Sequence, residues 1–252
     1  MPKVVVVTGA SGYIGSAIAA RFALEGGKVT VHYHGSRERA EQVAKRVNEA
    51  GGEALVWQAD IRRYPEVKRM VDETVKRWGR LDVMVSNAGG NLGMLGGKDK
   101  LLVDLEEEAW DLAMAVNLTG AFYCVKAAAP QMMQQKEGHI VLVASGTGLR
   151  GKEGMGAYAA SKMGVIGLMK TAARELGNFN IKVNALHPGR IMHGSVMAAL
   201  KSISQAAADE YLREAVLHHD NNADEFADFI FHLTEMQNVS GQSLNVDSRI
   251  LS

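Results

Sequence analysis

Several kinds of residue are scarce in this chain of 252 residues, and each scarcity excludes a class of protein. It has one cysteine, Cys124, so it can form no internal disulfide, which is typical of a reducing, cytoplasmic compartment. The four prolines mark no linker, so residues 1–252 are expected to form a single domain. The 28 basic and 28 acidic residues balance to zero net charge, which argues against nucleic acid or an anionic membrane as a partner.

The chain also lacks the patterns of a membrane or metal protein. Residues 1–3 lead directly into a strand-like apolar run, so no signal peptide is expected, and no apolar run is expected to reach the length of a membrane span. Two of the eight histidines, His218 and His219, are adjacent, and adjacent residues do not share a helix face. The sequence therefore predicts no bound metal.

Glycine is plentiful, with 27 residues, and one cluster follows the first apolar run. Residues 4–7 are valines, typical of a strand buried on both faces. Residues 8–15 read Thr-Gly-Ala-Ser-Gly-Tyr-Ile-Gly, and a helical pattern over 16–25 precedes a second strand over 28–33. This order predicts a dinucleotide-binding unit, because the glycines let the backbone approach a pyrophosphate at a helix N-terminus. The cofactor contacts expected here are Gly9, Ser11, Gly12, Tyr13, Ile14 and Gly15.

The end of the second predicted strand indicates which cofactor binds. A site specific for NAD(H) usually places Asp or Glu there to hold the ribose 2′-hydroxyl. This chain has no carboxylate between residue 32 and Glu38, but it does have Ser36 and Arg37, which could bind a 2′-phosphate. The sequence therefore favours NADP(H), with NAD(H) as the alternative.

Apolar runs of strand length alternate with helical patterns along the rest of the chain. The predicted strands cover 53–58, 81–86, 140–144 and 182–186, and the predicted helices cover 37–50, 65–78, 105–133 and 157–176. This alternation predicts an α/β fold: a single-domain, Rossmann-like, doubly wound parallel sheet with helices on both faces. Ligands of such sheets bind at the carboxyl ends of the strands, which is where the motifs lie.

One spacing carries the most specific chemical signal. Ser145 ends the strand pattern 140–144, and Tyr158 and Lys162, four residues apart, share one face of a predicted helix. The ammonium can then lie beside the phenol and lower its pKa from about 10 towards neutrality. The Ser145 hydroxyl could hold a carbonyl oxygen while the phenol donates a proton to it.

Together with Asp60, Asn117 and residues 87–89 and 188–189, these motifs resemble the short-chain dehydrogenase/reductase family, in its single-domain branch and over nearly the whole chain. The resemblance implies that Tyr158 is the general acid or base, that Ser145 holds the substrate carbonyl, and that Lys162 lowers the tyrosine pKa and holds the nicotinamide ribose. It implies that Asn117 holds a water of the proton relay. The further cofactor contacts that it implies are Asp60, Ile61, Asn87, Ala88, Gly89, Pro188, Gly189 and Ile191.

The chain departs from the family pattern at a few positions. Tyr13 stands where this branch usually has glycine, a spacing more typical of the longer, epimerase-like branch. Gly12 occupies a place where relatives that prefer NADP often have a basic residue, so the cofactor prediction depends on Ser36 and Arg37. His193 replaces a threonine that usually contacts the nicotinamide carboxamide, and residues 247–249 read Asp-Ser-Arg in place of Asp-Gly-Gly.

The substrate is the least determined part of the prediction. Similarity to 3-oxoacyl-(acyl carrier protein) reductases implies reduction by NADPH of a ketone, a 3-oxoacyl thioester on acyl carrier protein or coenzyme A. Lys98 and Lys100 could meet such an anionic carrier, and a substrate lid is expected at about 190–219. The alternatives are a polyol, steroid or other secondary alcohol, a pteridine, a nucleotide sugar in an epimerase or dehydratase, or a nonenzymatic NADP(H) sensor. The family also implies a homo-oligomer, a dimer or tetramer.

Overall fold

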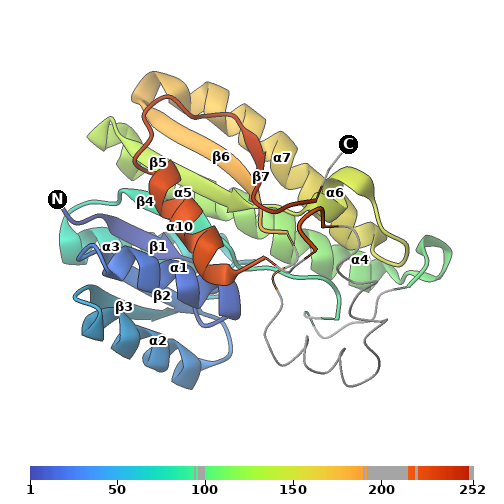
Figure 1. Ribbon diagram of the computed structural model, residues 1–252, viewed down its shortest axis with the longest axis horizontal. Coiled ribbons are helices and arrows are strands. Elements are labelled where there is room, and N and C mark those ends of the chain that lie inside the picture. The colour runs from blue at the N-terminus through green and yellow to red at the C-terminus, as the bar shows by residue number, and fades with distance from the viewer. Residues whose placement is uncertain (94, 96–99, 190, 192–214, 219–220, 250–252) are drawn as a thin grey trace.

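The valine run forms strand β1 (Val4–Val7), and all four side chains are buried. It belongs to a seven-stranded parallel sheet with the order β3-β2-β1-β4-β5-β6-β7 (Figure 1). The other strands are β2 (Lys28–Tyr33), β3 (Glu53–Gln58), β4 (Val83–Ser86), β5 (Gly138–Val143), β6 (Ile181–His187) and β7 (Ser243–Asn245). The computed structural model describes residues 1–93, 95, 100–189, 191, 215–218 and 221–249.

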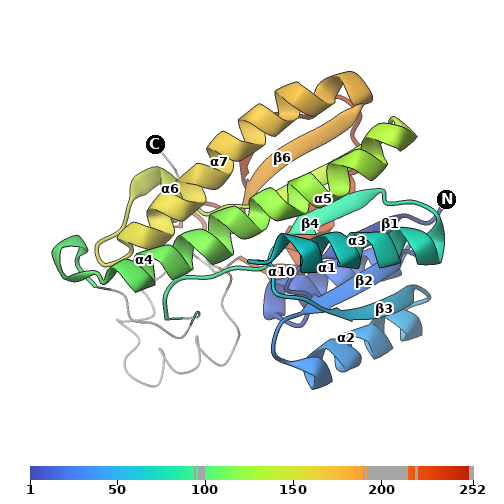
Figure 2. The ribbon, with the colours of Figure 1, turned by 180° about the vertical axis from the view of Figure 1, so that it is seen from behind.

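Helices cover both faces of this sheet. One face carries α1 (Tyr13–Ala23), α2 (Arg37–Glu49) and α10 (Ala223–Leu233), as Figure 1 shows. The other face carries α3 (Tyr64–Trp78), α5 (Gly120–Gln135) and α7 (Gly156–Leu176), as seen from behind in Figure 2. A separate apolar core lies between the sheet and each set of helices. The predicted doubly wound α/β fold is therefore confirmed.

The strand order reverses between β1 and β4, since β2 and β3 extend the sheet to one side and β5 to β7 to the other. Doubly wound sheets bind their ligands at such a reversal, outside the carboxyl ends of the strands. The fold thus brings the ends of β1, β4 and β5 to one edge, together with the turns that follow them.

The long helix predicted over 105–133 differs from the observed structure in one respect. It consists of α4 (Glu107–Met114), a π-helical turn η2 (Ala115–Thr119) and α5. A π-turn is rare and often marks a functional site, and here it contains Asn117. The short elements η1 (Leu102–Asp104), α6 (Gly146–Arg150) and η3 (Gly177–Phe179) complete the described chain.

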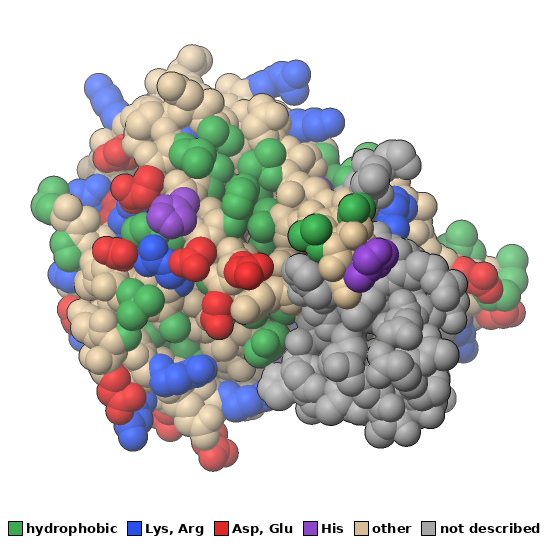
Figure 3. Space-filling view, viewed as in Figure 1, with side chains coloured by type: hydrophobic (Ala, Val, Ile, Leu, Met, Phe, Trp, Pro, Cys, Tyr) green, Lys and Arg blue, Asp and Glu red, His purple; other side chains and the backbone are tan. Residues whose placement is uncertain are grey.

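The same helical run corrects the expectation that no segment reaches membrane-spanning length. Among the described residues, Glu107–Gln135 is long and apolar enough to cross a membrane by length and composition. Half of its most apolar window is buried inside the protein, as in the core helix of a globular domain. On the face shown in Figure 3, acidic and basic side chains are interspersed between apolar ones.

Candidate functional site

The glycine-rich turn between β1 and α1 has the backbone geometry of an anion cradle. A Cβ atom on Gly15 would lie 2.3 Å from the carbonyl oxygen of Gly9 and 2.8 Å from Cα of Ala10, so only glycine fits there. Gly12 precedes helix α1 without a side-chain cap, and the first turn of the helix contains no acidic residue. The N-terminus of α1 therefore offers N–H groups and a positive dipole end to a pyrophosphate.

A buried histidine holds the backbone of this turn in place through hydrogen bonds. His32, at the end of β2, is 1% exposed and accepts a hydrogen bond from the Gly9 N–H at Nδ1, 2.9 Å away. Its Nε2 lies 3.0 Å from the Ala59 carbonyl oxygen and donates to it, because Nδ1 already acts as the acceptor. Burial lowers the pKa of His32 to about 4, so the ring is neutral near pH 7. This role of His32 is not among the predictions from the sequence, although its place near the end of the strand beside the turn indicates it.

The predicted catalytic residues come together at the carboxyl end of β5. Ser145 caps the N-terminus of α6, where its Oγ accepts a hydrogen bond from the Thr147 N–H at 3.2 Å. The Tyr158 side chain, from the first turns of α7, is hydrogen-bonded to that of Ser145. Lys162 follows one turn later, and its Nζ lies 5.9 Å from the centre of the tyrosine ring.

Burial dominates the electrostatics of this group. Burial raises the pKa of Tyr158, and the hydrogen bond with Ser145 opposes that rise. The ammonium of Lys162 is itself buried and donates to the carbonyl oxygen of Val143 at 2.7 Å. Burial also lowers the pKa of Lys162 to about 8, so it still carries its charge near pH 7.

Asn117 connects the π-turn to the end of β4. Its Oδ1 accepts a hydrogen bond from the Gly90 N–H at 2.9 Å, and its Nδ2 donates to the Gly90 carbonyl at 3.0 Å. A Cβ on Gly89, whose φ is +151°, would lie 2.4 Å from Asn117 Oδ1 and 3.5 Å from Lys162 Nζ. Glycine at 89 thus lets the loop lie directly against the amide and the ammonium.

The loop after β4 is also tied to the loop after β1. The Thr8 hydroxyl accepts hydrogen bonds from the N–H groups of Asn87 and Ala88 at 2.9 and 3.0 Å. The Asn87 amide donates to the Thr8 carbonyl at 2.9 Å. The structure therefore places the predicted cofactor contacts at 87–89 beside the glycine-rich turn.

The residues predicted to bind a 2′-phosphate lie at the start of α2, but their contacts differ from the simplest expectation. Ser36 precedes the helix, and its hydroxyl accepts a hydrogen bond from Arg39 Nε at 2.8 Å. Arg37 extends along the helix to Glu41, with 2.7 Å between Nε and Oε1, and its side chain is 76% exposed. Arg39 is a further basic group at this place that was not predicted, although its position three residues after Ser36 indicates that the two lie close together.

Two further predicted cofactor residues follow β3. The carboxylate of Asp60 is held by the guanidinium of Arg62, at 2.7 Å from Nη2, and this hydrogen-bonded pair lowers the pKa of Asp60. Ile61 is 7% exposed and packs towards Gly120 of α5, within the core. The Ile61 side chain thus belongs to the core under α5.

Beyond β6, the predicted nicotinamide contacts are anchored by the C-terminal segment. Asn221 Nδ2 donates to the Pro188 carbonyl at 2.6 Å, and Ile191 pairs with Asn221. A Cβ on Gly189 would collide with Asp247, whose carboxylate forms a buried ion pair with Arg249. The unusual Asp-Ser-Arg sequence thus packs against the turn after β6. His193, Lys98 and most of the lid predicted at 190–219 lie outside the described residues.

These residues fit a nicotinamide dinucleotide. The glycine cradle suits a pyrophosphate, residues 87–89 follow β4 next to it, Asp60 follows β3 on the other side of β2, and the Ser145–Tyr158–Lys162 group lies at the carboxyl end of β5. A phenol hydrogen-bonded to a hydroxyl, with a buried ammonium one helical turn away, can exchange a proton with a substrate oxygen.

Comparisons with known proteins agree with this geometry. A family model described as short chain dehydrogenase matches residues 3–204. The chain is 37% identical over 249 residues to the 3-oxoacyl-[acyl-carrier-protein] reductase FabG of Staphylococcus epidermidis, with 98% of each chain covered. Its fold is similar to NAD⁺-bound xylitol dehydrogenase (TM-score 0.88, 30% identity, 98% of both chains covered). It is also similar to levodione reductase (TM-score 0.89, 29% identity, 98% of this chain and 97% of that chain covered).

Proposed function

Since this chain belongs to the short-chain dehydrogenase family, we propose that it reduces the ketone of a 3-oxoacyl thioester to a secondary alcohol, with NADPH as the cofactor. The observation that carries the proposal is the hydrogen-bonded Ser145–Tyr158 pair beside the buried Lys162. The thioester is favoured because a relative that matches over 98% of both chains is a 3-oxoacyl-[acyl-carrier-protein] reductase.

In this mechanism the bound nicotinamide supplies the hydride, and the protein supplies the proton. The Ser145 hydroxyl donates a hydrogen bond to the substrate carbonyl oxygen and so holds it beside the Tyr158 phenol. Because burial raises the pKa of Tyr158, the phenol keeps its proton at neutral pH and can donate it to that oxygen as negative charge develops there.

Lys162 and Asn117 complete the proposed site. The ammonium of Lys162 has three N–H donors, of which one binds Val143, so others are free to hold the nicotinamide ribose hydroxyls. Asn117 holds the loop at residue 90 in place, and its π-turn is where we place the water of the proton relay. Tyr158 regains its proton through this relay after each turnover.

The preference for NADPH is supported by the basic groups at the start of α2. Ser36, Arg37 and Arg39 lie at the start of α2, which follows the strand whose end usually contacts the 2′-substituent of the adenosine ribose, and no carboxylate lies between His32 and Glu38. A 2′-phosphate would gain charge-assisted hydrogen bonds from these side chains, whereas a 2′-hydroxyl would leave them without an anionic partner.

We further propose that the protein works as a homo-oligomer in the cytoplasm, on a substrate carried by acyl carrier protein or coenzyme A. The single cysteine, Cys124, is buried, and burial raises its pKa to about 11, so the thiol is inert and is compatible with a reducing compartment. Exposed Phe122 on α5 and Met163 on α7 provide an apolar surface for a second copy.

A dehydrogenase of a polyol or another secondary alcohol is the second candidate. The specific support is the fold similarity to xylitol dehydrogenase and levodione reductase, at TM-scores of 0.88 and 0.89. The same Ser145–Tyr158 pair serves both directions, because the phenolate that forms at high pH accepts the alcohol proton.

The proposal is tested by following the absorbance of reduced nicotinamide with acetoacetyl-coenzyme A and a panel of ketones and polyols. We expect NADPH consumption with the thioester. Tyr158→Phe should lower kcat by at least about a hundredfold, because it removes the proton donor and little else. Turnover of another carbonyl alone would replace the thioester assignment, and cofactor binding without any turnover would indicate the sensor instead.

A further inference from the structure

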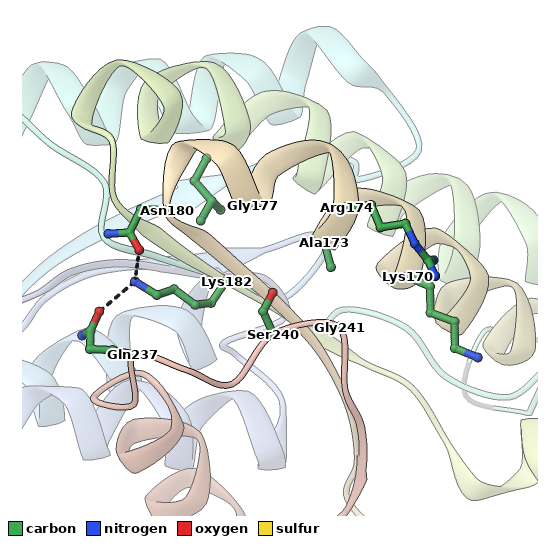
Figure 4. A pocket seen from close by; sticks show the side chains of 10 residues that line it. Lys170, Ala173, Arg174, Gly177, Asn180, Lys182, Gln237, Ser240 and Gly241 are labelled. Carbon is green, nitrogen blue, oxygen red and sulfur yellow. Dashed lines mark hydrogen bonds between the residues drawn. The ribbon is translucent and has the colours of Figure 1, made fainter.

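Strand β6 has a buried polar side chain near each end. At the amino end, beside a cavity of about 540 Å³, the Lys182 ammonium donates hydrogen bonds to Asn180 Oδ1 and Gln237 Oε1, both at 2.8 Å (Figure 4). At the carboxyl end, the His187 ring is completely buried, and its Nε2 lies 2.7 Å from Ser243 Oγ. No described residue forms a hydrogen bond of normal geometry with the other ring nitrogen, Nδ1. This end of β6 is the catalytic end of the sheet.

A buried nitrogen without a hydrogen bond is rare in this molecule. Among the described residues, the one other example is the indole Nε1 of Trp78. That indole lies beside the exposed Glu53 carboxylate, whose pKa is lowered by Arg77 and then by Trp78. His187 has no such anion beside Nδ1, and a buried polar atom of this kind calls for a physical reason.

The strand pattern places His187 on the same side of the sheet as the catalytic helix α7. Val183 and Ala185 belong to the core on that side, together with residues of α7. Side chains alternate along a strand, so His187 continues the face of these two residues. Its ring therefore lies between the sheet and the helix that carries Tyr158.

The backbone of Ser145 is a polar neighbour of this ring. The Ala144 N–H donates to the Leu186 carbonyl at 2.8 Å, so the residues that follow, Ser145 and His187, lie side by side. Burial lowers the pKa of His187, and the Ser145 backbone opposes this shift. A backbone group that favours the charged ring must be an acceptor, so it is the carbonyl oxygen. This oxygen accepts from the Gly148 N–H at 3.0 Å, and its second lone pair can accept from Nδ1.

The tautomer of the ring follows from these neighbours. A carbonyl oxygen only accepts, so Nδ1 must carry the proton in order to donate to Ser145. The Ser243 hydroxyl can donate or accept, and it therefore donates to the unprotonated Nε2. The charged groups around the ring are Asp247, which favours a charged ring, and Lys162 and Arg249, which disfavour it. Together with burial, they leave the ring neutral near pH 7.

We propose that His187 is a positioning residue, whose Nδ1–H group holds the carbonyl of Ser145 and so fixes the Ser145 hydroxyl beside the Tyr158 phenol. The known contacts of Ser145 with the Thr147 N–H and with Tyr158 act on the hydroxyl, whereas His187 acts on the main chain. Hydrogen bonds that serve catalysis are often long or poorly aligned until the reacting complex forms, which accounts for the incomplete bond at Nδ1. The inference rests on the proposed carbonyl reduction and deepens it.

Two substitutions separate the two nitrogens of the ring. Asparagine places an amide nitrogen near the position of Nδ1, and glutamine places one near that of Nε2. We expect His187→Asn to keep kcat within about threefold of the parent, and His187→Gln to lower it by about ten- to a hundredfold, because the Ser145 hydroxyl is then no longer fixed. The KM for NADPH should change by less than about twofold in both variants, because the glycine-rich turn is unaltered.

The stability of the two variants should follow the opposite order. His187→Asn gives up the hydrogen bond with Ser243 and leaves space in the core, so its unfolding midpoint should lie a few degrees below that of His187→Gln. If His187 were purely structural, the less stable variant would also be the less active one. That outcome, or equal kcat values in the two variants, would overturn the proposal.

Nitrogen NMR of isotope-labelled histidine rings measures the tautomer without turnover and without a change at His187. The His187 signals, identified by their change in Ser243→Ala, should show a protonated Nδ1 and an unprotonated Nε2. Ser243→Ala should weaken this preference and lower kcat, whereas Gln242→Ala, at the neighbouring exposed position, should alter neither. A proton on Nε2 of the parent would overturn the proposal. A parent that reduces no carbonyl would instead reject the proposed function, while the tautomer would still decide the contact with Ser145.

Discussion

At the scale of single residues, His32 shows how one buried side chain can shape a cofactor site. It bridges the Gly9 N–H and the Ala59 carbonyl, and so holds the glycine-rich turn against the ends of β2 and β3. Only the neutral ring can accept from Gly9 and donate to Ala59 at the same time. Protonation would place two donors face to face, so the turn depends on the ring remaining neutral.

This dependence predicts how stability changes with pH. The folded pKa of His32 is about 4, below the usual value of 6.5, so the unfolded chain binds a proton between these limits that the folded chain does not bind. The free energy of unfolding should therefore fall as the pH is lowered from about 6.5 to about 4. His139, whose pKa burial also lowers to about 4, adds a fall of the same sign.

Urea unfolding at several pH values measures this effect. In His32→Gln, the free energy of unfolding should change less steeply with pH between 4 and 6.5, by a slope that corresponds to up to about one proton. His34→Gln, at the exposed position two residues later, serves as the control. If the plots of unfolding free energy against pH are parallel for the parent and His32→Gln, then His32 does not cause the loss of stability at low pH.

Arg39 leads to a second prediction at this scale. If it binds the 2′-phosphate together with Ser36, Arg39→Gln should raise the KM for NADPH by about tenfold or more, because a charge-assisted hydrogen bond contributes about 1.5–3 kcal/mol. The KM for NADH should stay within about twofold of the parent. Arg46→Gln, in the last turn of α2, is the matched control. An equal loss for both cofactors would argue against a role in phosphate recognition.

At the scale of elements, close backbone contacts decide where glycine is needed. Gly15 in α1 and Gly167 in α7 are both helical glycines, but their surroundings differ. A Cβ at Gly15 meets the backbone of the turn at 2.3 Å, whereas a Cβ at Gly167 meets no atom within 4 Å. The first glycine is required by the approach of α1 to β1, and the second is tolerated at a cost in helix stability.

The two positions make a matched pair of substitutions. Gly167→Ala should stabilise the protein by about 0.4–1 kcal/mol, because alanine reduces the entropy of the unfolded chain and favours the helix. Gly15→Ala should destabilise it and weaken cofactor binding by at least about tenfold, because the cradle must open to admit the methyl group. Denaturant unfolding and fluorescence titration with NADPH measure both effects. A Gly15→Ala protein with normal affinity would contradict the cradle geometry.

At the scale of the whole molecule, two cores flank the sheet, yet some apolar side chains remain outside them. Phe122 on α5 is 42% exposed and Met163 on α7 is 49% exposed, and the two helices lie side by side on one face (Figure 2). Exposed apolar residues on adjacent helices often mark an interface. The proposed homo-oligomer would cover them and would also stabilise the helix that carries Tyr158.

Sedimentation velocity provides the test of this surface. Phe122→Asp should shift the protein towards the monomer, because an interface would then have to bury an unpaired charge. Leu24→Asp, at an exposed position on the opposite face of the molecule, should leave the distribution of sedimentation coefficients unchanged. A monomeric parent protein, or an unchanged distribution in Phe122→Asp, would exclude this surface as the interface.

The sequence by itself determined the order of the strands from β1 to β6 and which three candidate catalytic residues lie together. Valine runs and the helical period are local signals, so β1, β2 and β3 fall within the ranges predicted for them. Ser145, Tyr158 and Lys162 could be predicted together because parallel strands end at one edge and residues four apart share a helix face. The glycine-rich turn was equally local, since its residues are contiguous.

The tertiary structure alone decided the features that depend on residues far apart in the chain. Burial raised the pKa of Tyr158 and directed Lys162 to Val143, since desolvation depends on packing that no local pattern encodes. The pairing of Arg37 with Glu41 left Arg39 beside Ser36, and side-chain geometry determines that choice. The cavity of about 540 Å³ between α7, β6 and the loop before β7 likewise exists only because these elements meet there, from separate parts of the sequence.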